Sequence, residues 1–298
     1  MKRIILTGDD FGLAVPLNEA IVEAHCAGGL TAASLMVTGE AAADAVARAK
    51  RTPSLKIGLH LVLVEGRPAL PPSTVPDLVD SRGEFPTNLT AAGFRFFFRP
   101  AVRRQLAAEI RAQFEAFRRT GLQLDHVNAH NHMHLHPTVF RLILQTGGEF
   151  GMKAVRLPNE PPMLSLRASR RAWFSKIAMW LYVAPWLRLM KHRVRRAGLV
   201  CNDFVFGISH SGVMSADPVL RILKRLPEGT TELYFHPATR RCPEIDRTMP
   251  DYDHEGEYRF LTSAAMKTAL ELAGAQRIAF RDLLERMPAE QVSFTPVS

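Results

Sequence analysis

Residues 3–12 of the chain read RIILTGDDFG. The short apolar run at the start of this stretch predicts a buried strand, and Gly8 with the carboxylates of Asp9 and Asp10 marks its end. Two adjacent carboxylates repel one another and resist desolvation, so both are tolerated there if one meets a cation and the other a proton or hydrogen-bond donors. A simple turn is the alternative interpretation, because Asp and Gly favour turns.

The rest of the chain repeats this order of a buried strand followed by polar side chains. The run 56–64, KIGLHLVLV, is a predicted strand that carries His60, a later strand precedes His130, and TELYF at 231–235 precedes His236. Helical patterns separate these strands, which predicts βαβ units. Functional groups at the carboxyl ends of parallel strands are typical of an α/β barrel or a doubly wound sheet.

Length and composition are those of a globular protein with a large core. The chain has 298 residues, of which 47% are hydrophobic and 22% charged, and these values exclude a disordered chain or a disulfide miniprotein. The length fits two ordinary domains or one α/β barrel of about 250 residues with an insertion. We expect one domain over 1–298, with a rim or lid loop at about 65–97 where Pro and Gly are frequent. Three widely spaced cysteines and a short apolar run at the start predict a reducing, cytoplasmic protein without a signal peptide.

Histidine is concentrated in one segment. The sequence DHVNAHNHMHLHP at 125–137 holds five of the eleven histidines, all at even positions. They would share one face if the segment is extended, and would fan around a rim if it turns before Pro137. This concentration of imidazole favours metal binding, with two or three histidines as ligands and the others near ligands or substrate. Alone, His60 reads as a structural core histidine and His236 as weak support, but with the cluster His236 supplies a general acid.

Four motifs in this order resemble the YdjC/ChbG-like carbohydrate deacetylases over nearly the whole chain: DDFG, GLHL, an HxHxH segment before Pro, and a late HP after a strand. The sequences DHVNAHNHMHLHP and KAVRLPNEPP, with a basic, tryptophan-bearing insertion, are most similar to the hopanoid-biosynthesis-associated HpnK branch. That branch is implicated in removing an acetyl group from N-acetylglucosaminyl bacteriohopanetetrol. The resemblance implies a distorted (β/α) barrel.

The resemblance also implies the roles of the site residues. Asp10, His60 and His130 would hold one divalent metal ion, Mg²⁺ or Zn²⁺, while Asp9 would be the base and His236 the acid. Such a two-histidine, one-carboxylate site leaves positions for water and a substrate oxygen. A bound metal lowers the pKa of its water from 15.7 towards about 7. The candidates for substrate contact are Asn128, His132, His134 and Arg156.

Position 128 departs from the pattern of the family. Many relatives carry Asp two residues before the first histidine of HxHxH, where this chain has Asn128. An amide donates and accepts hydrogen bonds, but it supplies no charge. Any polarisation of a metal ligand by a carboxylate at this position is therefore absent here.

The net charge of +9 resides in one segment. Residues 161–202 hold nine basic residues and no acidic one, and the rest of the chain is balanced. All three tryptophans lie there too, around an apolar run at 177–187 that is shorter than the roughly 20 residues needed to span a bilayer. Aromatic and basic side chains together predict a membrane-interfacial segment. A helix packed on the barrel and a dimer interface are the alternatives. The sequence GFRFFFRP at 93–100 repeats the pattern and is either a second contact or the start of a buried helix. The predicted membrane contacts are Trp173, Trp180, Trp186 and Arg188.

These observations predict a metal-dependent deacetylase that removes an N-acetyl group from a glycolipid headgroup, peripherally associated with the cytoplasmic face of the inner membrane. One alternative is a deacetylase of a soluble N-acetylated oligosaccharide. Another is a non-catalytic lipid-binding protein at the membrane surface. Nucleic-acid binding is disfavoured because the basic segment is interleaved with apolar residues and the remainder is neutral. The sequence defines no oligomeric state.

Overall fold

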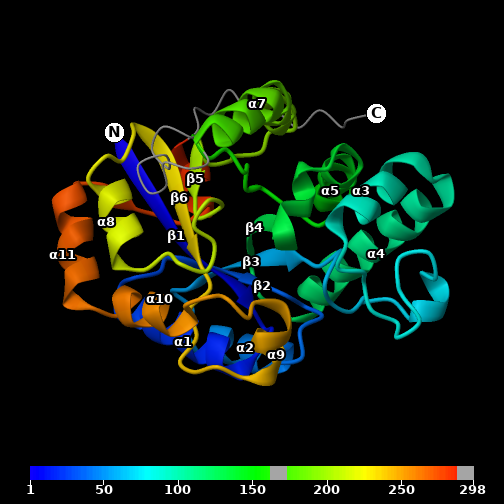
Figure 1. Cartoon of the computed structure of the whole chain (residues 1–298), viewed down its shortest axis with the longest axis horizontal. Coiled ribbons are helices and arrows are strands. Elements are labelled where there is room, and N and C mark those ends of the chain that lie inside the picture. The colour runs from blue at the N-terminus through cyan, green and yellow to red at the C-terminus, as the bar shows by residue number, and fades with distance from the viewer. Residues whose placement is uncertain (162–172, 287–298) are drawn as a thin grey trace.

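The chain folds around one curled sheet of parallel strands, shown in Figure 1. The structure is a computed structural model that describes residues 1–161 and 173–286. The strands lie in the order β4-β3-β2-β1-β6-β5, and β7 pairs with β1. Their bounds are β1 Lys2–Phe11, β2 Ala32–Leu35, β3 Lys56–Leu61, β4 Leu124–Ala129, β5 Phe204–Phe206, β6 Gly229–Phe235 and β7 Gln276–Arg277.

Isolated bridges continue the sheet beyond β4. Val127 pairs with Val155, and Ala154 pairs with Val200, just before β5. Residues 153–157 contribute only these bridges, so the sheet is a curled half-barrel rather than a ring of full strands. The α/β class and the parallel arrangement agree with the sequence.

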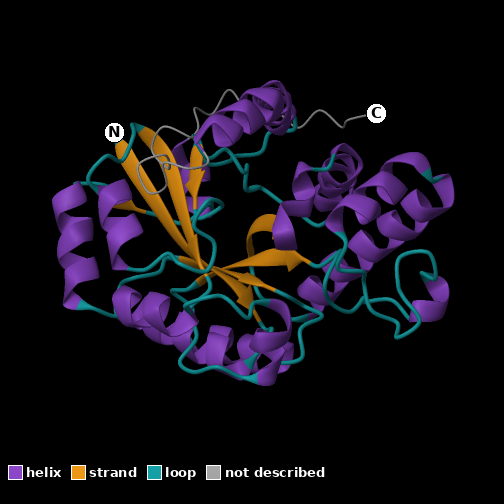
Figure 2. Ribbon diagram, viewed as in Figure 1, coloured by secondary structure: helices purple, strands orange, loops and turns teal. Residues whose placement is uncertain are grey.

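Helices cover the outside of the sheet (Figure 2). Helix α4 illustrates why they form there: Val102, Leu106, Ile110, Phe114 and Phe117 recur at helical spacing and are all buried. The helices are α1 Val15–Cys26, α2 Ala42–Arg51, α3 Leu89–Phe98, α4 Pro100–Arg119, α5 Pro137–Glu149, α7 Trp173–Arg196, α8 Ala216–Leu223, α9 Pro243–Thr248, α10 His254–Leu261 and α11 Ala264–Ala273. Short 3₁₀ turns lie at η1 Pro72–Thr74, η2 His130–Leu135 and η5 Arg281–Arg286.

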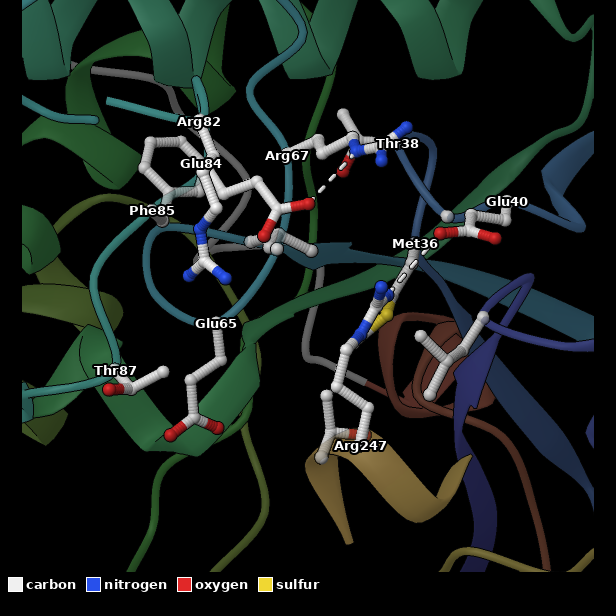
Figure 3. A pocket seen from close by; sticks show the side chains of 15 residues that line it. Met36, Thr38, Glu40, Glu65, Arg67, Arg82, Glu84, Phe85, Thr87 and Arg247 are labelled. Atoms are coloured by element: carbon white, nitrogen blue, oxygen red, sulfur yellow. Dashed lines mark hydrogen bonds and ion pairs between the residues drawn. The ribbon is translucent and has the colours of Figure 1, made fainter. Parts of the chain in front are cut away.

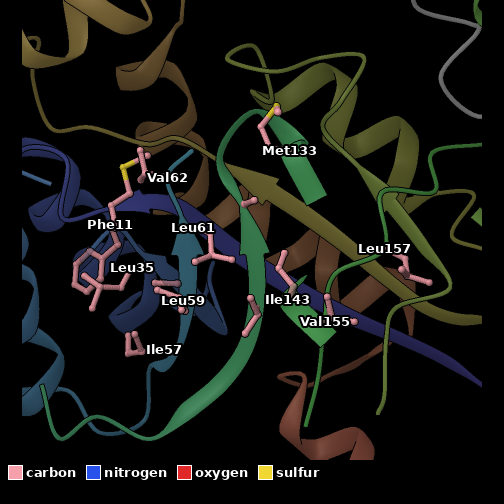
Figure 4. Packing of buried hydrophobic residues seen from close by; sticks show 14 of the residues in the cluster. Phe11, Leu35, Ile57, Leu59, Leu61, Val62, Met133, Ile143, Val155 and Leu157 are labelled. Atoms are coloured by element: carbon pink, nitrogen blue, oxygen red, sulfur yellow. The ribbon is translucent and has the colours of Figure 1, made fainter. Parts of the chain in front are cut away.

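The apolar core lies against the strands that carry the polar site. Phe11, Leu35, Leu59 and Leu61 come from three neighbouring strands, are fully buried, and belong to one cluster (Figure 4). Burial of each such side chain contributes about 1.5–3 kcal/mol. Because side chains alternate along a strand, the packing of Leu59 and Leu61 directs His60 to the opposite face. The core therefore orients a histidine of the site.

The predicted rim loop at 65–97 is irregular only in its first part, because α3 occupies its end. Asn88 caps this helix, with Oδ1 accepting a hydrogen bond from the Ala91 N–H. The loop itself is held by Glu109 of α4, a buried carboxylate that accepts hydrogen bonds from the backbone N–H groups of residues 69 and 70 at 2.7 and 3.0 Å. Burial raises the pKa of Glu109. The rim is thus attached to the barrel through a buried acid.

Helix α7 falls within the predicted insertion. The side chains of Trp173 and Trp180 lie outside the described residues. Trp186 is half-buried, and its indole N–H donates to the Leu135 carbonyl at 2.8 Å. The face with Ala184, Leu187, Met190 and Val194 is buried, whereas Leu181, Tyr182, Arg188 and Leu189 are exposed. Within the described part of the chain, no helix has the length and apolar character that crossing a bilayer requires.

Candidate metal centre and active site

Unusual backbone conformations bring the site together at the carboxyl edge of the sheet. Strand β1 continues through Asp9 and Asp10 instead of ending before them, and Asp10 has a left-handed φ of 58° beside a shift in the pairing of β1 with β2. After β4 the chain turns at Asn131 and His132, with φ of 51° and 52°. Such conformations are uncommon for residues other than glycine. The histidine segment therefore fans around a rim, as one of the two alternatives predicted.

Asp10, His60 and His130 meet at this edge, and all three are buried. Asp10 Oδ1 lies 3.1 Å from His60 Nε2 and 3.0 Å from His130 Nδ1. One donor atom from each residue falls within 4.8 Å of the other two. Asp10 Oδ2 is buried without a hydrogen-bond partner in the described structure. Two imidazoles, one carboxylate and an unpartnered oxygen fit a divalent cation.

The three groups also influence one another's protonation. Burial alone would raise the pKa of Asp10, but His130 and His60 hold it well below its usual range. Burial would lower the pKa of His130, but Asp10 and Glu65 raise it to about 10. A cation would replace the proton that His130 holds here.

Asp9 lies beside the triad and is paired with a buried arginine. Arg156 donates to Asp9 through Nη1 at 2.5 Å and Nη2 at 3.0 Å, and to Glu232 through Nε at 2.8 Å and Nη2 at 2.7 Å. Burial would raise the pKa of Asp9, but Arg156 holds it far below the usual range, so the carboxylate is ionised at neutral pH. Arg156 is fully buried behind Asp9, so it orients this carboxylate instead of facing the pocket, where the sequence placed it as a substrate contact.

His236 follows β6 and approaches the triad from the other side, with Nε2 3.8 Å from Asp10 Oδ2. Burial lowers its pKa to about 4. Its backbone is held twice: the N–H donates to Glu257 at 2.6 Å, and the carbonyl lies 2.6 Å from His254 Nδ1. Glu257 also accepts from the Met214 N–H at 2.8 Å, and burial raises its pKa to about 7. Neither Glu257 nor His254 was singled out from the sequence, because they lie far along the chain from His236 and in no recognised motif.

A cavity of about 210 Å³ opens over these groups. His132 lies on its wall with Nε2 3.0 Å from the Tyr234 hydroxyl, and burial lowers the pKa of His132 to about 3. Asn128 and His134 are fully buried beneath it, and His134 Nδ1 accepts from the Ala129 N–H at 3.1 Å. Tyrosines were not predicted here. The cavity is lined by Asp9, His60, Glu65, Ala129, His130, Asn131, His132, Ile208, Ser211, Tyr234, His236, Thr248, Met249 and Tyr252.

A second cavity of about 180 Å³ adjoins the first and shares Glu65 and Thr248 with it. Its walls carry two ion pairs, Arg67 with Glu84 at 3.3 Å and Arg247 with Glu40 at 3.3 Å, and the ring of Phe85 also lines it (Figure 3). Paired charges present both donors and acceptors to a neutral polar ligand.

Fold and site together define an α/β protein with a two-histidine, one-carboxylate centre at the carboxyl edge of a parallel sheet. The family model described as YdjC-like protein matches residues 3–272, and the chain belongs to this family.

Curated relatives carry the name carbohydrate deacetylase. The human protein is 31% identical over 99% of this chain and 95% of its own length. The protein of Geobacillus stearothermophilus is 29% identical over 94% and 98%, and that of Brevibacillus brevis is 37% identical over 54% and 60%.

A solved structure confirms the fold. The Enterococcus faecalis V583 protein described as a putative cellobiose-phosphate cleavage protein superposes with a TM-score of 0.74 at 24% identity, over 95% of this chain and 98% of that one.

Proposed function

We propose that this protein is a metal-dependent deacetylase that hydrolyses an N-acetyl group on a carbohydrate. The observation that carries the proposal is the convergence of the Asp10–His60–His130 triad with Asp9 and His236 around one cavity. The names of the relatives support the same activity. A metal held by the triad would polarise the acetyl carbonyl and its bound water.

The chain's own residues account for the proton transfers. Hydrolysis joins the water oxygen to the carbonyl carbon and breaks the carbon–nitrogen bond, so that acetate and a free amine leave. Asp9 is ionised and fixed by Arg156, and it accepts a proton from the attacking water. His236, on the other side of Asp10, passes a proton to the departing nitrogen. Because burial keeps the imidazole neutral, His236 first takes up a proton from solvent in the cavity, and the proton that Asp9 accepted returns to solvent after acetate and the amine leave.

For the substrate, we propose the N-acetylated headgroup of a glycolipid at the cytoplasmic face of the inner membrane. The sequence resemblance indicates N-acetylglucosaminyl bacteriohopanetetrol. Exposed apolar side chains beside the site support this choice. Phe94, Phe97 and Phe98 of α3 are 62%, 49% and 66% exposed, and residues 85–108 contain four arginines and no acidic residue.

The exposed surfaces of α3 and α7 both adjoin the turn that carries His130 of the triad. The Phe97 ring lies 6.1 Å from that of His136, and Trp186 of α7 is bonded to Leu135. Aromatic and basic groups placed in this way suit the interface of an anionic membrane. Tyr182, 83% exposed, belongs to the same surface of α7.

The second cavity favours the alternative substrate, a soluble N-acetylated oligosaccharide. Its ion pairs and the Phe85 ring would suit the hydroxyl groups and the apolar face of a neighbouring sugar unit.

A direct comparison of substrates tests both levels of the proposal. The metal-loaded protein is given N,N′-diacetylchitobiose in solution and an N-acetylglucosaminyl lipid in anionic vesicles, and released acetate is measured. Release from either supports the deacetylase, and a preference for the vesicle substrate supports the glycolipid. Release from neither, with metal bound at one equivalent, contradicts the activity.

A further inference from the structure

The amide of Asn128 lies at the centre of the site and meets conflicting demands. It is fully buried. One end lies 2.6 Å from His60 Nδ1, and the other lies 2.9 Å from Ser34 Oγ and 3.4 Å from Asp9 Oδ1. That second end is also 2.9 Å from Arg156 Nη1 and 3.1 Å from Nη2. Oxygen and nitrogen can be exchanged between the two ends by rotating the amide, so its neighbours decide the orientation.

Arg156 requires a hydrogen-bond acceptor, and therefore the amide oxygen, at this second end of Asn128. Its guanidinium has five N–H groups, and four of them are used by Asp9 and Glu232. The fifth, on Nη1, points to the Asn128 end at 2.9 Å. When the amide oxygen occupies this end, its NH₂ group faces His60 and donates to Nδ1.

This orientation suits the protein without a cation. His60 Nε2 lies 3.1 Å from Asp10 Oδ1, and a carboxylate oxygen at that distance requires a proton on the nitrogen. A neutral imidazole protonated at Nε2 has its lone pair on Nδ1, where the Asn128 NH₂ group meets it. His60 and Arg156 then both have a complementary partner in the amide, although its oxygen lies 3.4 Å from Asp9 Oδ1.

A cation bound to His60 requires the opposite orientation of the Asn128 amide. It needs the lone pair of Nε2, so the proton moves to Nδ1 and calls for an acceptor 2.6 Å away. The amide oxygen must face His60, and the NH₂ group turns to Ser34. The Ser34 hydroxyl then donates to His126 Nε2 at 3.0 Å, and His126 Nδ1 donates to Asp125 at 2.8 Å. Each hydrogen bond from His60 to Asp125 then joins a donor to an acceptor, but the Asn128 NH₂ group now faces the N–H donors of Arg156.

We propose that Asn128 is a positioning residue whose amide rotates when a divalent cation binds His60, and that this rotation weakens metal binding relative to a carboxylate at position 128. A carboxylate accepts from His60 and Arg156 at once and needs no rotation. The inference shares the metal triad with the proposed function but does not depend on deacetylation.

The first test reads the His60 proton directly in the full chain. Long-range ¹H–¹⁵N spectra are recorded before and after one equivalent of Zn²⁺, with the His60 signals assigned by their loss in His60→Gln. We expect the proton on Nε2 without zinc and on Nδ1 with zinc. A proton on Nδ1, or on both nitrogens, before zinc is added would overturn the rotation. Unchanged His60 signals with zinc bound would remove His60 from the metal site, whatever the enzyme activity.

The second test measures Zn²⁺ affinity by competition with a chelator. Asn128→Asp should bind zinc at least tenfold more tightly than the wild type. Asn131→Asp is the matched control, because it adds the same charge beside His130, where Asn131 contacts Glu65 instead of His60. We expect less than a threefold change there. Equal tightening in both variants would assign the effect to charge alone and refute the role of Asn128. If Asn128→Asp does not fold, the wild-type spectra still decide the matter.

Discussion

Replacing the buried acid beneath His236, in Glu257→Gln, should remove the contribution of this group to the pH dependence of stability. Burial raises the pKa of Glu257 from 4.5 to about 7. Since the folded protein binds this proton more tightly than the unfolded chain, the contribution of Glu257 to stability is full below about pH 4.5 and falls as the pH rises towards 7. At 1.36 kcal/mol for each pKa unit, the loss is about 3 kcal/mol. A glutamine cannot ionise, so the variant lacks this slope.

The assay is reversible urea unfolding of both proteins at several pH values between 4.5 and 8, at constant ionic strength. The stability of the wild type relative to Glu257→Gln should decrease by about 3 kcal/mol across this range. The glutamine accepts only one of the two backbone N–H groups, from Met214 and His236, so its absolute stability is offset by about 1 kcal/mol at every pH. Metal content should not change. A difference between the two proteins that stays constant with pH would refute the reasoning.

Three further predictions concern the site and the surface. Asp9→Asn should retain one equivalent of metal but slow acetate release by about 100-fold or more, because it removes a base without removing a ligand; near wild-type turnover would require another base. Phe97→Ala with Phe98→Ala should reduce binding to anionic vesicles and turnover of the vesicle substrate, with unchanged turnover of a soluble sugar as the control; unaltered vesicle binding would remove α3 from the membrane contact. Each of the variants Asp10→Ala, His60→Ala and His130→Ala should lose stoichiometric metal binding, measured by elemental analysis, while its circular dichroism spectrum stays native. Metal retained by two of these three variants would contradict the triad.

The positions of the strands could be predicted because burial on both faces leaves continuous apolar runs. The run before Asp9 and the alternation around His60 are local signals, and the structure places β1 and β3 there. The extent of helix α3 was not predicted although Asn88 is a favourable cap, because Pro and Gly in the residues before it suggested a loop to residue 97, and a helix start was one of two interpretations of 93–100. Its exposed phenylalanines were therefore not separated from its buried one, Phe96.

Long-range pairing had no such local signal. Arg156 stands 147 residues from Asp9 and 76 from Glu232. From the sequence alone, Arg156 therefore reads equally well as a substrate contact. Its burial between two carboxylates emerges only when β1, β6 and the bridged segment at 154–155 come together. Without Arg156, two acids would be buried unpaired at the centre of the sheet, which is strongly unfavourable.

The backbone conformations at the site are set by side-chain contacts more than by the intrinsic conformational preferences of the residues. Among the described residues, Asp10, Glu65, Asn131 and His132 are the non-glycine residues with positive φ. Three of them line the cavity and the fourth, Asp10, belongs to the triad. Conformations of this kind cost about 1–3 kcal/mol each and persist where surrounding contacts impose them. At Asp10 the left-handed backbone directs Oδ1 to both His60 and His130. In a regular strand, where side chains alternate from face to face, the Asp10 side chain would have a different orientation relative to that of Asp9. The strain is therefore located where two adjacent carboxylates must serve different partners, Asp9 with Arg156 and Asp10 with the histidines.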